Sequence, residues 1–288
     1  MPKRKNRFQS GALRFLYRTV PGRVILAGLT RPAVSRACGR YMDSRFSRRK
    51  IRGFVRRSGI RLSDYRARDY CSFNDFFTRR IRPELRPIDC RPGSLIAPCD
   101  GKLSAYRITA DARFPIKGST YSVRELIGGN PVASRYDSGI CLVFRLGVED
   151  YHRYCYLDDG TKGENVFLPG RLHTVQPIAL ASYPVFVQNC REYTVMETEH
   201  FGIVTQIEVG AMLVGKIRNF HGVGRIRRGA EKGMFLYGGS TVVVLLEKDA
   251  AVLPGALWSA TERGLETPVR YGQHIGEVPS AALCSGLI

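Results

Sequence analysis

A run of five consecutive apolar residues near the end of the chain, Val242 to Leu246, constrains the fold more than any other feature. Such a run, rich in β-branched side chains and apolar on both faces, predicts a strand in the middle of a sheet. Two glycines, Ser240 and Thr241 stand directly before it. Two glycines commonly mark a plain turn. Because glycine lacks a Cβ, the backbone there can also be strained enough for the Ser240 hydroxyl to attack the carbonyl of Gly239.

The remaining pattern divides the chain into a helical part and a β-rich part. Residues 8–60 place apolar side chains at helical spacing, and a linker rich in proline and glycine follows at 83–93. Beyond it we expect strands at 95–98, 141–144, 183–187, 193–197, 203–209 and 242–246. Ser122 with Glu125 is a capping-box pattern that predicts a short helix, and the tail after Pro254 is expected to be peripheral.

These patterns predict an α+β fold with two regions. A helical region, residues 1–88, would pack on a mainly antiparallel β core, residues 89–288. The excess charge lies in the first region: residues 1–86 hold 24 Lys and Arg against 5 Asp and Glu, whereas residues 87–288 hold 21 against 20. A basic amphipathic pattern of this kind fits an anionic lipid surface, a solvated face packed on the protein's own core, or a nucleic-acid-binding arm. Charge alone leaves all three open.

Cysteine and histidine usage bears on compartment and metal content. Eight cysteines are scattered without a Cys-x-x-Cys pair, and no secretory signal is evident, so we expect free thiols in a reducing cytosol. No run of 18 apolar residues occurs, so no transmembrane helix is expected. The five histidines show no metal-ligand spacing, and no metal is expected.

Six short blocks occur in a fixed order along the chain. They are Ser72–Arg80, Arg86–Ile88, Ala97–Lys102, Asp150–Tyr154, Glu208–Gly215 and Gly239–Thr241. Over about residues 70–248 this series resembles the phosphatidylserine decarboxylases, a family of pyruvoyl-dependent proenzymes. The resemblance implies a carboxy-lyase that converts phosphatidylserine to phosphatidylethanolamine. It further implies self-cleavage between Gly239 and Ser240 into a β chain, 1–239, and an α chain, 240–288, with Ser240 becoming the covalent pyruvoyl cofactor.

The resemblance also implies roles for individual side chains. In the family an Asp–His–Ser set activates the serine; here Asp100 takes the orienting role, and His152 matches the first histidine of the His-Arg-x-His block. Cys155 occupies the position of the second, which is the base. Since a thiol is normally protonated near neutral pH, another base is needed, and the candidates are His152, His173 and Cys155 itself. We favour His173, which would replace the lost histidine from an adjoining strand, and assign His152 as the acid that protonates the substrate carbon.

The expected partners follow from the same resemblance. They are phosphatidylserine, the anionic membrane surface and the protein's own two cleaved chains; a homodimer is left open, and nucleic acid is not expected. The expected location is cytoplasmic and peripheral to the membrane. Two alternatives stay open from the sequence: a decarboxylase of another serine-headed lipid, such as archaetidylserine, and a membrane- or nucleic-acid-binding β protein that never processes itself. Cys155 is the residue that keeps the second alternative open.

Overall fold

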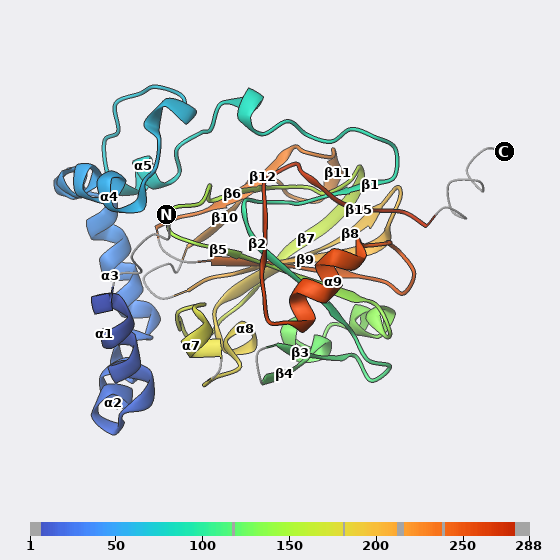
Figure 1. The fold of residues 1–288 in the computed structure, drawn as a ribbon, viewed down its shortest axis with the longest axis horizontal. Helices are drawn as coiled ribbons and strands as arrows, with labels where there is room; N and C mark the ends of the chain where they lie inside the picture. The colour runs from blue at the N-terminus through green and yellow to red at the C-terminus, as the bar shows by residue number, and fades with distance from the viewer. Residues whose placement is uncertain (1–6, 117–118, 181, 212–215, 238–239, 280–288) are drawn as a thin grey trace.

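The computed structural model describes residues 7–116, 119–180, 182–211, 216–237 and 240–279. An eight-stranded antiparallel sheet forms its centre, with the order β11-β7-β8-β9-β13-β5-β2-β14 (Figure 1). The strands are β2 (Gly101–Arg107), β5 (Ile140–Leu146), β7 (Gly160–Leu168), β8 (Arg191–Thr198), β9 (Gly202–Val209), β11 (Gly224–Ile226), β13 (Ser240–Leu246) and β14 (Thr267–Val269). Together with the helices described below, this sheet confirms the predicted α+β class.

Strand β13 lies at the centre of this sheet, paired antiparallel with β5 on one side and β9 on the other. All seven of its residues are buried. Val242 and Val244 face one core cluster, and Val243 and Leu245 face a second cluster on the other side of the sheet. Burying an aliphatic side chain contributes about 1.5–3 kcal/mol. A strand that is apolar on both faces is therefore stable only between two packed layers, and the prediction of a central strand is confirmed.

Smaller sheets complete the β structure. A three-stranded sheet has the order β10 (Ile217–Asn219), β12 (Glu231–Phe235), β6 (Arg153–Cys155), and two-stranded sheets join β1 (Ser94–Ile96) with β15 (His274–Glu277) and β3 (Arg113–Ile116) with β4 (Ser119–Ser122). Cys155 of β6 and Phe235 of β12 share a core cluster with Val242. The three-stranded sheet therefore covers the Val242 face of the central sheet.

The N-terminal region is helical, as predicted. Helices α1 (Arg7–Arg18), α2 (Val20–Leu29), α3 (Pro32–Asp43) and α4 (Lys50–Ser58) gather at one end of the molecule, and α5 (Phe73–Phe77) follows them (Figure 1). Phe73 and Phe77 of α5 pack edge-on against Tyr237, which lies just before β13 in the chain. The helical region thus contacts the core near the start of its central strand. The boundary at residue 88 stays a prediction.

The other helices are short. They are α6 (Val123–Leu126), α7 (Pro177–Leu180), α8 (Val185–Gln188) and α9 (Gly255–Glu262), with 3-10 turns η1 (Arg45–Arg49), η2 (Leu62–Asp64), η3 (Pro83–Leu85) and η4 (Pro131–Tyr136). Helix α6 forms where predicted, with Ser122 at its N-cap, but the Ser122 side chain makes no capping hydrogen bond. Among the described helices, none combines the length and the apolar character needed to cross a bilayer.

Two predictions about secondary structure are wrong. The segment 183–187 contains no strand; helix α8 begins at Val185, directly after Pro184, and buries Val185 and Phe186. The β-branched and aromatic composition of this segment therefore serves packing rather than sheet pairing. The described part of the tail after Pro254, residues 255–279, is not peripheral, because β14 pairs with β2 and β15 pairs with β1.

Candidate active site

One end of the central sheet brings together the segments that carry the candidate residues. Ser240, the first residue of β13, is paired with Leu146, the last residue of β5. Thr241 is paired with Val209, the last residue of β9. Asp100 immediately precedes β2, whose first residues run beside the end of β5. Antiparallel pairing therefore sets the start of β13 beside the ends of both its neighbours, so residues distant in sequence meet there.

Ser240 is the residue around which the site is built. Its side chain is fully buried, and its Oγ has no hydrogen-bond partner among the residues that the structure describes. A buried hydroxyl left without a partner costs about 1–3 kcal/mol, so a purely structural serine would be expected to be bonded. An unengaged hydroxyl fits a serine that is consumed chemically. Gly239, the other half of the expected cleavage site, lies outside the described residues.

Asp100 is held by two groups other than a histidine. Its carboxylate accepts hydrogen bonds from both ends of the Arg86 guanidinium, with Nε 2.7 Å from Oδ1, and from the backbone N–H of Tyr271 at 2.8 Å. Bidentate pairing of arginine with a carboxylate fixes the orientation of both groups. Within the described part of the chain, no histidine bonds to Asp100. Its role in orienting a histidine stays a prediction.

His152 lies beyond the turn that follows β5. Its Nδ1 is 2.8 Å from the backbone carbonyl oxygen of Asp150. A carbonyl can only accept, so Nδ1 carries the proton, and in the neutral ring Nε2 carries the lone pair. The imidazole packs on Phe77 with 4.1 Å between ring centroids, and Phe77 also contacts Tyr237, three residues before Ser240. His152 is therefore beside the segment that leads into Ser240, with the tautomer that proton transfer at Nε2 requires.

Cys155 is poorly suited to act as a base. The side chain is fully buried in the core cluster that covers one face of the central sheet. Burial raises the pKa of its thiol to about 12, although a hydrogen bond with Tyr271 opposes the shift. A thiol must be deprotonated to accept a proton, so Cys155 stays neutral and inactive as a base at neutral pH.

His173 lies elsewhere than the expected adjoining strand. Cys155 belongs to β6 of the three-stranded sheet, whereas His173 lies in an irregular segment after β7. The side chain of Asn189 clamps the His173 backbone: its Oδ1 accepts from the His173 N–H at 2.9 Å, and its Nδ2 donates to the His173 carbonyl at 2.8 Å. The same Nδ2 also donates to the carbonyl of Gly210 at 2.7 Å. Since Gly210 directly follows β9, the clamp fixes His173 near the Ser240 end of the sheet.

The imidazole of His173 is neutral at physiological pH. Burial lowers its pKa to about 4, and the positive charge of Arg171 acts in the same direction. Its Nε2 is buried and has no hydrogen-bond partner within the described ranges. A neutral ring with an unengaged nitrogen can accept a proton, which is what the expected base must do.

The two histidines approach the end of β13 from opposite sides. Side chains alternate along a strand, so Ser240 points to the face of Val242 and Thr241 to the face of Val243. His152 precedes β6, which covers the Val242 face, whereas Val175, two residues after His173, packs in the cluster on the Val243 face. His152 thus lies on the face to which Ser240 points, and His173 lies on the opposite face, near the same end of the strand.

A basic pocket of about 640 Å³ lies beside the segment that leads into Ser240. Its lining includes Leu236, four residues before Ser240, and it contains two acidic residues, Asp43 and Asp75. The cationic lining residues are Arg66, Arg68, Arg80, Arg153, Lys216 and Arg218. Arg68 pairs with Asp75, and Arg80 and Arg153 pair with Glu231. In the described structure no carboxylate pairs with Arg66, Lys216 or Arg218, so the pocket keeps positive charge that suits an anionic ligand.

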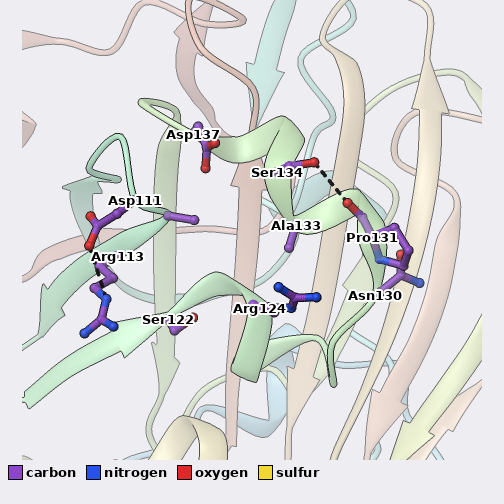
Figure 2. Close-up of a pocket in the computed structure, with 10 residues that line it drawn as sticks. Asp111, Arg113, Ser122, Arg124, Asn130, Pro131, Ala133, Ser134 and Asp137 are labelled. Carbon is purple, nitrogen blue, oxygen red and sulfur yellow. Dashed lines mark hydrogen bonds and ion pairs between the residues drawn. The ribbon is translucent and has the colours of Figure 1, made fainter.

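A second pocket, of about 490 Å³, is lined by residues of β3, the β4–α6 junction and η4 (Figure 2). Its charges balance: Asp111 pairs with Arg113 at 3.2 Å, and Asp137 and Arg124 complete the charged lining. None of the candidate catalytic residues lines it. We assign no part of the reaction to it.

A buried ion pair that the sequence pattern did not predict joins the central sheet to the three-stranded sheet. Lys232 Nζ lies 2.9 Å from both carboxylate oxygens of Glu208, and both side chains are fully buried. Asn219 bonds to both groups, and Gln206 donates to Glu208. Glu208 stands opposite Val242 in the sheet register. The one available signal was a carboxylate inside the apolar strand pattern at 203–209, because a buried charge requires a partner.

Among the described residues, no group of three or more His, Cys, Asp or Glu side chains is placed to hold a metal ion.

Comparison with known proteins agrees with the site. The family model described as phosphatidylserine decarboxylase matches residues 73–277. The phosphatidylserine decarboxylase proenzyme 2 of Clostridium acetobutylicum is 40% identical over 274 residues, covering 95% of this chain and 94% of its own length. The phosphatidylserine decarboxylase proenzyme of Clostridium botulinum strain Alaska E43 is 37% identical, covering 92% and 91%. That of Clostridium beijerinckii is 39% identical, covering 84% and 83%.

Proposed function

This chain belongs to the phosphatidylserine decarboxylase family, and on that premise we propose that it cuts its own backbone before Ser240 and then decarboxylates phosphatidylserine. The protein is a carboxy-lyase of phospholipid metabolism, synthesised as a proenzyme. The observation that carries the role of Ser240 is its buried, unpartnered hydroxyl at the start of the central strand.

The maturation chemistry requires one nucleophile and one base. The Ser240 Oγ would form an ester with the Gly239 carbonyl carbon while the amide bond between the two residues breaks, and its proton would pass by way of the base to the freed Ser240 nitrogen. Loss of the Ser240 α-proton would then expel Gly239 as a carboxylate, and hydrolysis would release the Ser240 nitrogen as ammonia. The pyruvoyl group formed in this way supplies a ketone that withdraws the electrons of the breaking bond to the substrate carboxylate.

His173 is the base in this proposal. Its neutral imidazole can accept the Ser240 proton, and the Asn189 clamp restricts the motion of its backbone. Positioned acid–base groups contribute about 10²–10⁴-fold to a rate. A reaction that each chain performs once can tolerate the weak basicity of a buried histidine.

His152 is the proton donor to the substrate carbon in this proposal. Its hydrogen bond to the Asp150 carbonyl keeps one proton on Nδ1, so the ring would donate from Nε2 after a second proton has been taken up there. Asp100 with Arg86 forms the charged group at the neighbouring strand end. We propose that this pair keeps the ends of β2 and β5 in place beside Ser240.

The basic pocket provides a reason for selecting an anionic headgroup. Phosphatidylserine carries a phosphate, a carboxylate and an ammonium group, so its headgroup has a net charge of about −1, whereas the product is about neutral. We propose that Lys216 and Arg218, which have no carboxylate partner in the described structure, attract the substrate headgroup. Loss of the carboxylate would then weaken binding and favour release of the product.

The N-terminal helices are proposed to hold the protein on the membrane surface. Apolar side chains are exposed on α2, with Val24 71% and Val20 67% accessible, and Arg23 and Arg31 are exposed next to them. Exposed apolar residues flanked by cations bind anionic lipid interfaces. This arrangement supports a peripheral membrane protein and favours lipid over nucleic acid as the partner of the basic region.

A pair of variants at adjacent buried hydroxyls tests the proposed maturation. Ser240→Ala should give a single full-length band on a denaturing gel and no phosphatidylethanolamine from phosphatidylserine vesicles. Thr241→Val is the matched control, because Thr241 is equally buried and its Oγ1 also has no partner among the described residues. This control should cleave normally, and its C-terminal fragment should show the mass of a pyruvoyl end. Cleavage in Ser240→Ala, or an unmodified amino end on the fragment, would contradict the proposal.

A further inference from the structure

Tyr17 is an unusual residue for the helix on which it lies. From residue 11 to the end of α1, the other side chains are exposed or half-buried, whereas Tyr17 is only 4% accessible. It packs in the core cluster on the Val243 face of the central sheet. The same contact region includes a backbone hydrogen bond from the Leu172 N–H to the Thr30 carbonyl, at 3.1 Å. Helices α1 and α2 therefore dock on the segment that carries His173.

The hydroxyl of Tyr17 lies beside both His173 and the next residue. The backbone N–H of Thr174 donates to the Tyr17 oxygen at 3.2 Å, and His173 Nδ1 is 3.4 Å from that oxygen. A phenolic oxygen can accept a second hydrogen bond, so it can receive the proton on Nδ1. Burial raises the pKa of Tyr17 to about 12, so the hydroxyl remains neutral.

Aromatic rings restrict the His173 imidazole on its other side. Tyr183 stacks on it with 4.8 Å between centroids and 21° between planes, and Tyr17 meets Tyr183 edge-on at 5.9 Å. Asn189 fixes the backbone of the same residue. The imidazole is thus held by packing, while its Nδ1 faces one hydroxyl and its Nε2 has no partner within the described chain.

We propose that Tyr17 is a positioning residue for His173: its hydroxyl accepts the Nδ1–H, which leaves the Nε2 lone pair to take the Ser240 proton during self-cleavage. This inference rests on the proposed function, in which His173 is the base. When Nε2 receives the proton, the ring carries a proton on both nitrogens, and Tyr17 stabilises the one on Nδ1. In serine hydrolases a carboxylate performs this task.

The arrangement makes maturation depend on the N-terminal helices. Tyr17 reaches His173 only while α1 is docked on the core, and α1 belongs to the same helical region that exposes apolar side chains to the membrane. A chain whose helices are undocked would keep its central sheet and yet lack the acceptor on Nδ1. Self-cleavage would therefore be slow until the helical region has docked on the core.

The test uses the full-length protein and two tyrosine-to-phenylalanine variants. Tyr17→Phe removes the hydroxyl and keeps the ring; we expect cleavage to slow about 10–100-fold, less than the about 10²–10⁴-fold contribution of an acid–base group, because the base itself remains. Tyr121→Phe is the matched control, because Tyr121 is buried in the same core cluster as Tyr17 and none of its described ring contacts is with His173. It should cleave at the wild-type rate. Cleavage is followed on denaturing gels, starting from freshly synthesised chain.

A pH profile separates positioning from a structural effect. The titratable groups around His173 are Tyr17, Tyr183 and Arg171. Wild-type cleavage should hold its rate down to about pH 5 and fall near the His173 pKa of about 4. In Tyr17→Phe the imidazolium loses an acceptor, so this fall should move to lower pH. A slower rate with an unmoved profile, or a wild-type rate, would overturn the inference.

The protonation of His173 can also be measured directly in uncleaved protein. This test does not require the Tyr17→Phe variant to fold. In full-length Ser240→Ala, ¹⁵N NMR of labelled histidine should find His173 protonated at Nδ1. Protonation at Nε2 would overturn the inference and leave the decarboxylase function intact. Normal cleavage in His173→Ala would also remove it without touching that function, whereas cleavage in Ser240→Ala would remove the proposed maturation itself.

Discussion

At the scale of single residues, the site is defined by polar groups that the core leaves unengaged. Ser240 Oγ and His173 Nε2 are both buried and both lack partners among the described residues. Buried polar groups are otherwise satisfied in folded proteins, and the exceptions here meet at one end of the central sheet. Cys155 shows the contrasting case, because it matches a catalytic position in sequence while its surroundings keep the thiol protonated.

The turn between β5 and His152 contains a carboxyl group, that of Asp150, whose ionisation opposes folding at neutral pH. Burial raises the pKa of Asp150 from 3.8 to about 6, and the negative charges of Glu149 and Asp100 add to the shift, while the Gly147 N–H opposes it. The folded state thus binds this proton more tightly than the unfolded chain. The stability that Asp150 contributes is fully present below pH 3.8 and is lost as the pH rises through about 6.

We therefore expect Asp150→Asn to stabilise the protein at pH 7 by about 1–2 kcal/mol, a value discounted for the partial exposure of the side chain. The amide oxygen can still accept from the Gly147 N–H. Urea unfolding of wild type and variant at pH 4 and pH 7 checks this, since the difference should vanish at pH 4. An equal difference at both pH values would mean that the carboxylate charge is not the cause. His173 has the opposite effect, because its contribution to the stability of the protein is lost as the pH falls from 6.5 towards 4. This contribution is common to the variant and the wild type, so it cancels in the comparison.

At the scale of elements, the C-terminal tail is ordered by strand pairing that its local composition did not predict. Strand β14 adds to the edge of the central sheet beside β2, and β15 pairs with β1. Both lie in the segment that would become the α chain, as does the central strand β13. Four strand pairs, β13–β5, β13–β9, β14–β2 and β15–β1, would therefore hold the two expected fragments together after cleavage.

The buried pair between β9 and β12 gives a test at this scale. Lys232→Met should destabilise the protein by about 3–5 kcal/mol, because it leaves the Glu208 carboxylate buried without its cation. Lys232→Met with Glu208→Leu should recover much of that loss, since the uncompensated charge is removed. Thermal or urea unfolding measures both variants.

An exposed ion pair provides the matched control for the buried one. Arg61→Ala breaks the pair with Asp64, in which the arginine side chain is 80% accessible, and should cost less than about 1 kcal/mol. If Lys232→Met cost no more than Arg61→Ala, the buried network would not stabilise the packing of β12 on the central sheet.

At the scale of the whole molecule, charge and exposed apolar surface are concentrated in one helical region. The helices gather at one end of the molecule (Figure 1). Phe77 of α5 contacts Tyr237, and Tyr17 of α1 packs in the core cluster on the Val243 face. A single orientation could thus place the helices on lipid and bring the basic pocket near the headgroups. The membrane would then hold both the enzyme and its substrate at one surface.

Vesicle binding tests this orientation. Wild-type protein should sediment with phosphatidylserine-containing vesicles and less so as salt rises, since screening weakens the attraction of its cations. Val24→Asp on α2 should weaken binding about tenfold by placing a negative charge in the apolar contact. Val223→Asp is the control, because Val223 is 68% accessible but lies between β10 and β11, outside the helical region. Equal loss in both variants would contradict docking through α2.

The sequence by itself determined the features that depend on local pattern. The apolar run 242–246 requires burial on both faces, the spacing of apolar residues at 8–60 favours helices, and the ordered blocks indicate the family. The tertiary structure alone decided which groups meet. Residues 185–188 form a helix, and the C-terminal tail pairs with β1 and β2. Tyr17 contacts His173, and Lys232 pairs with Glu208. The physical reason is that periodicity reports which face of an element is buried, whereas the partner on that face is set by packing between residues far apart in the chain.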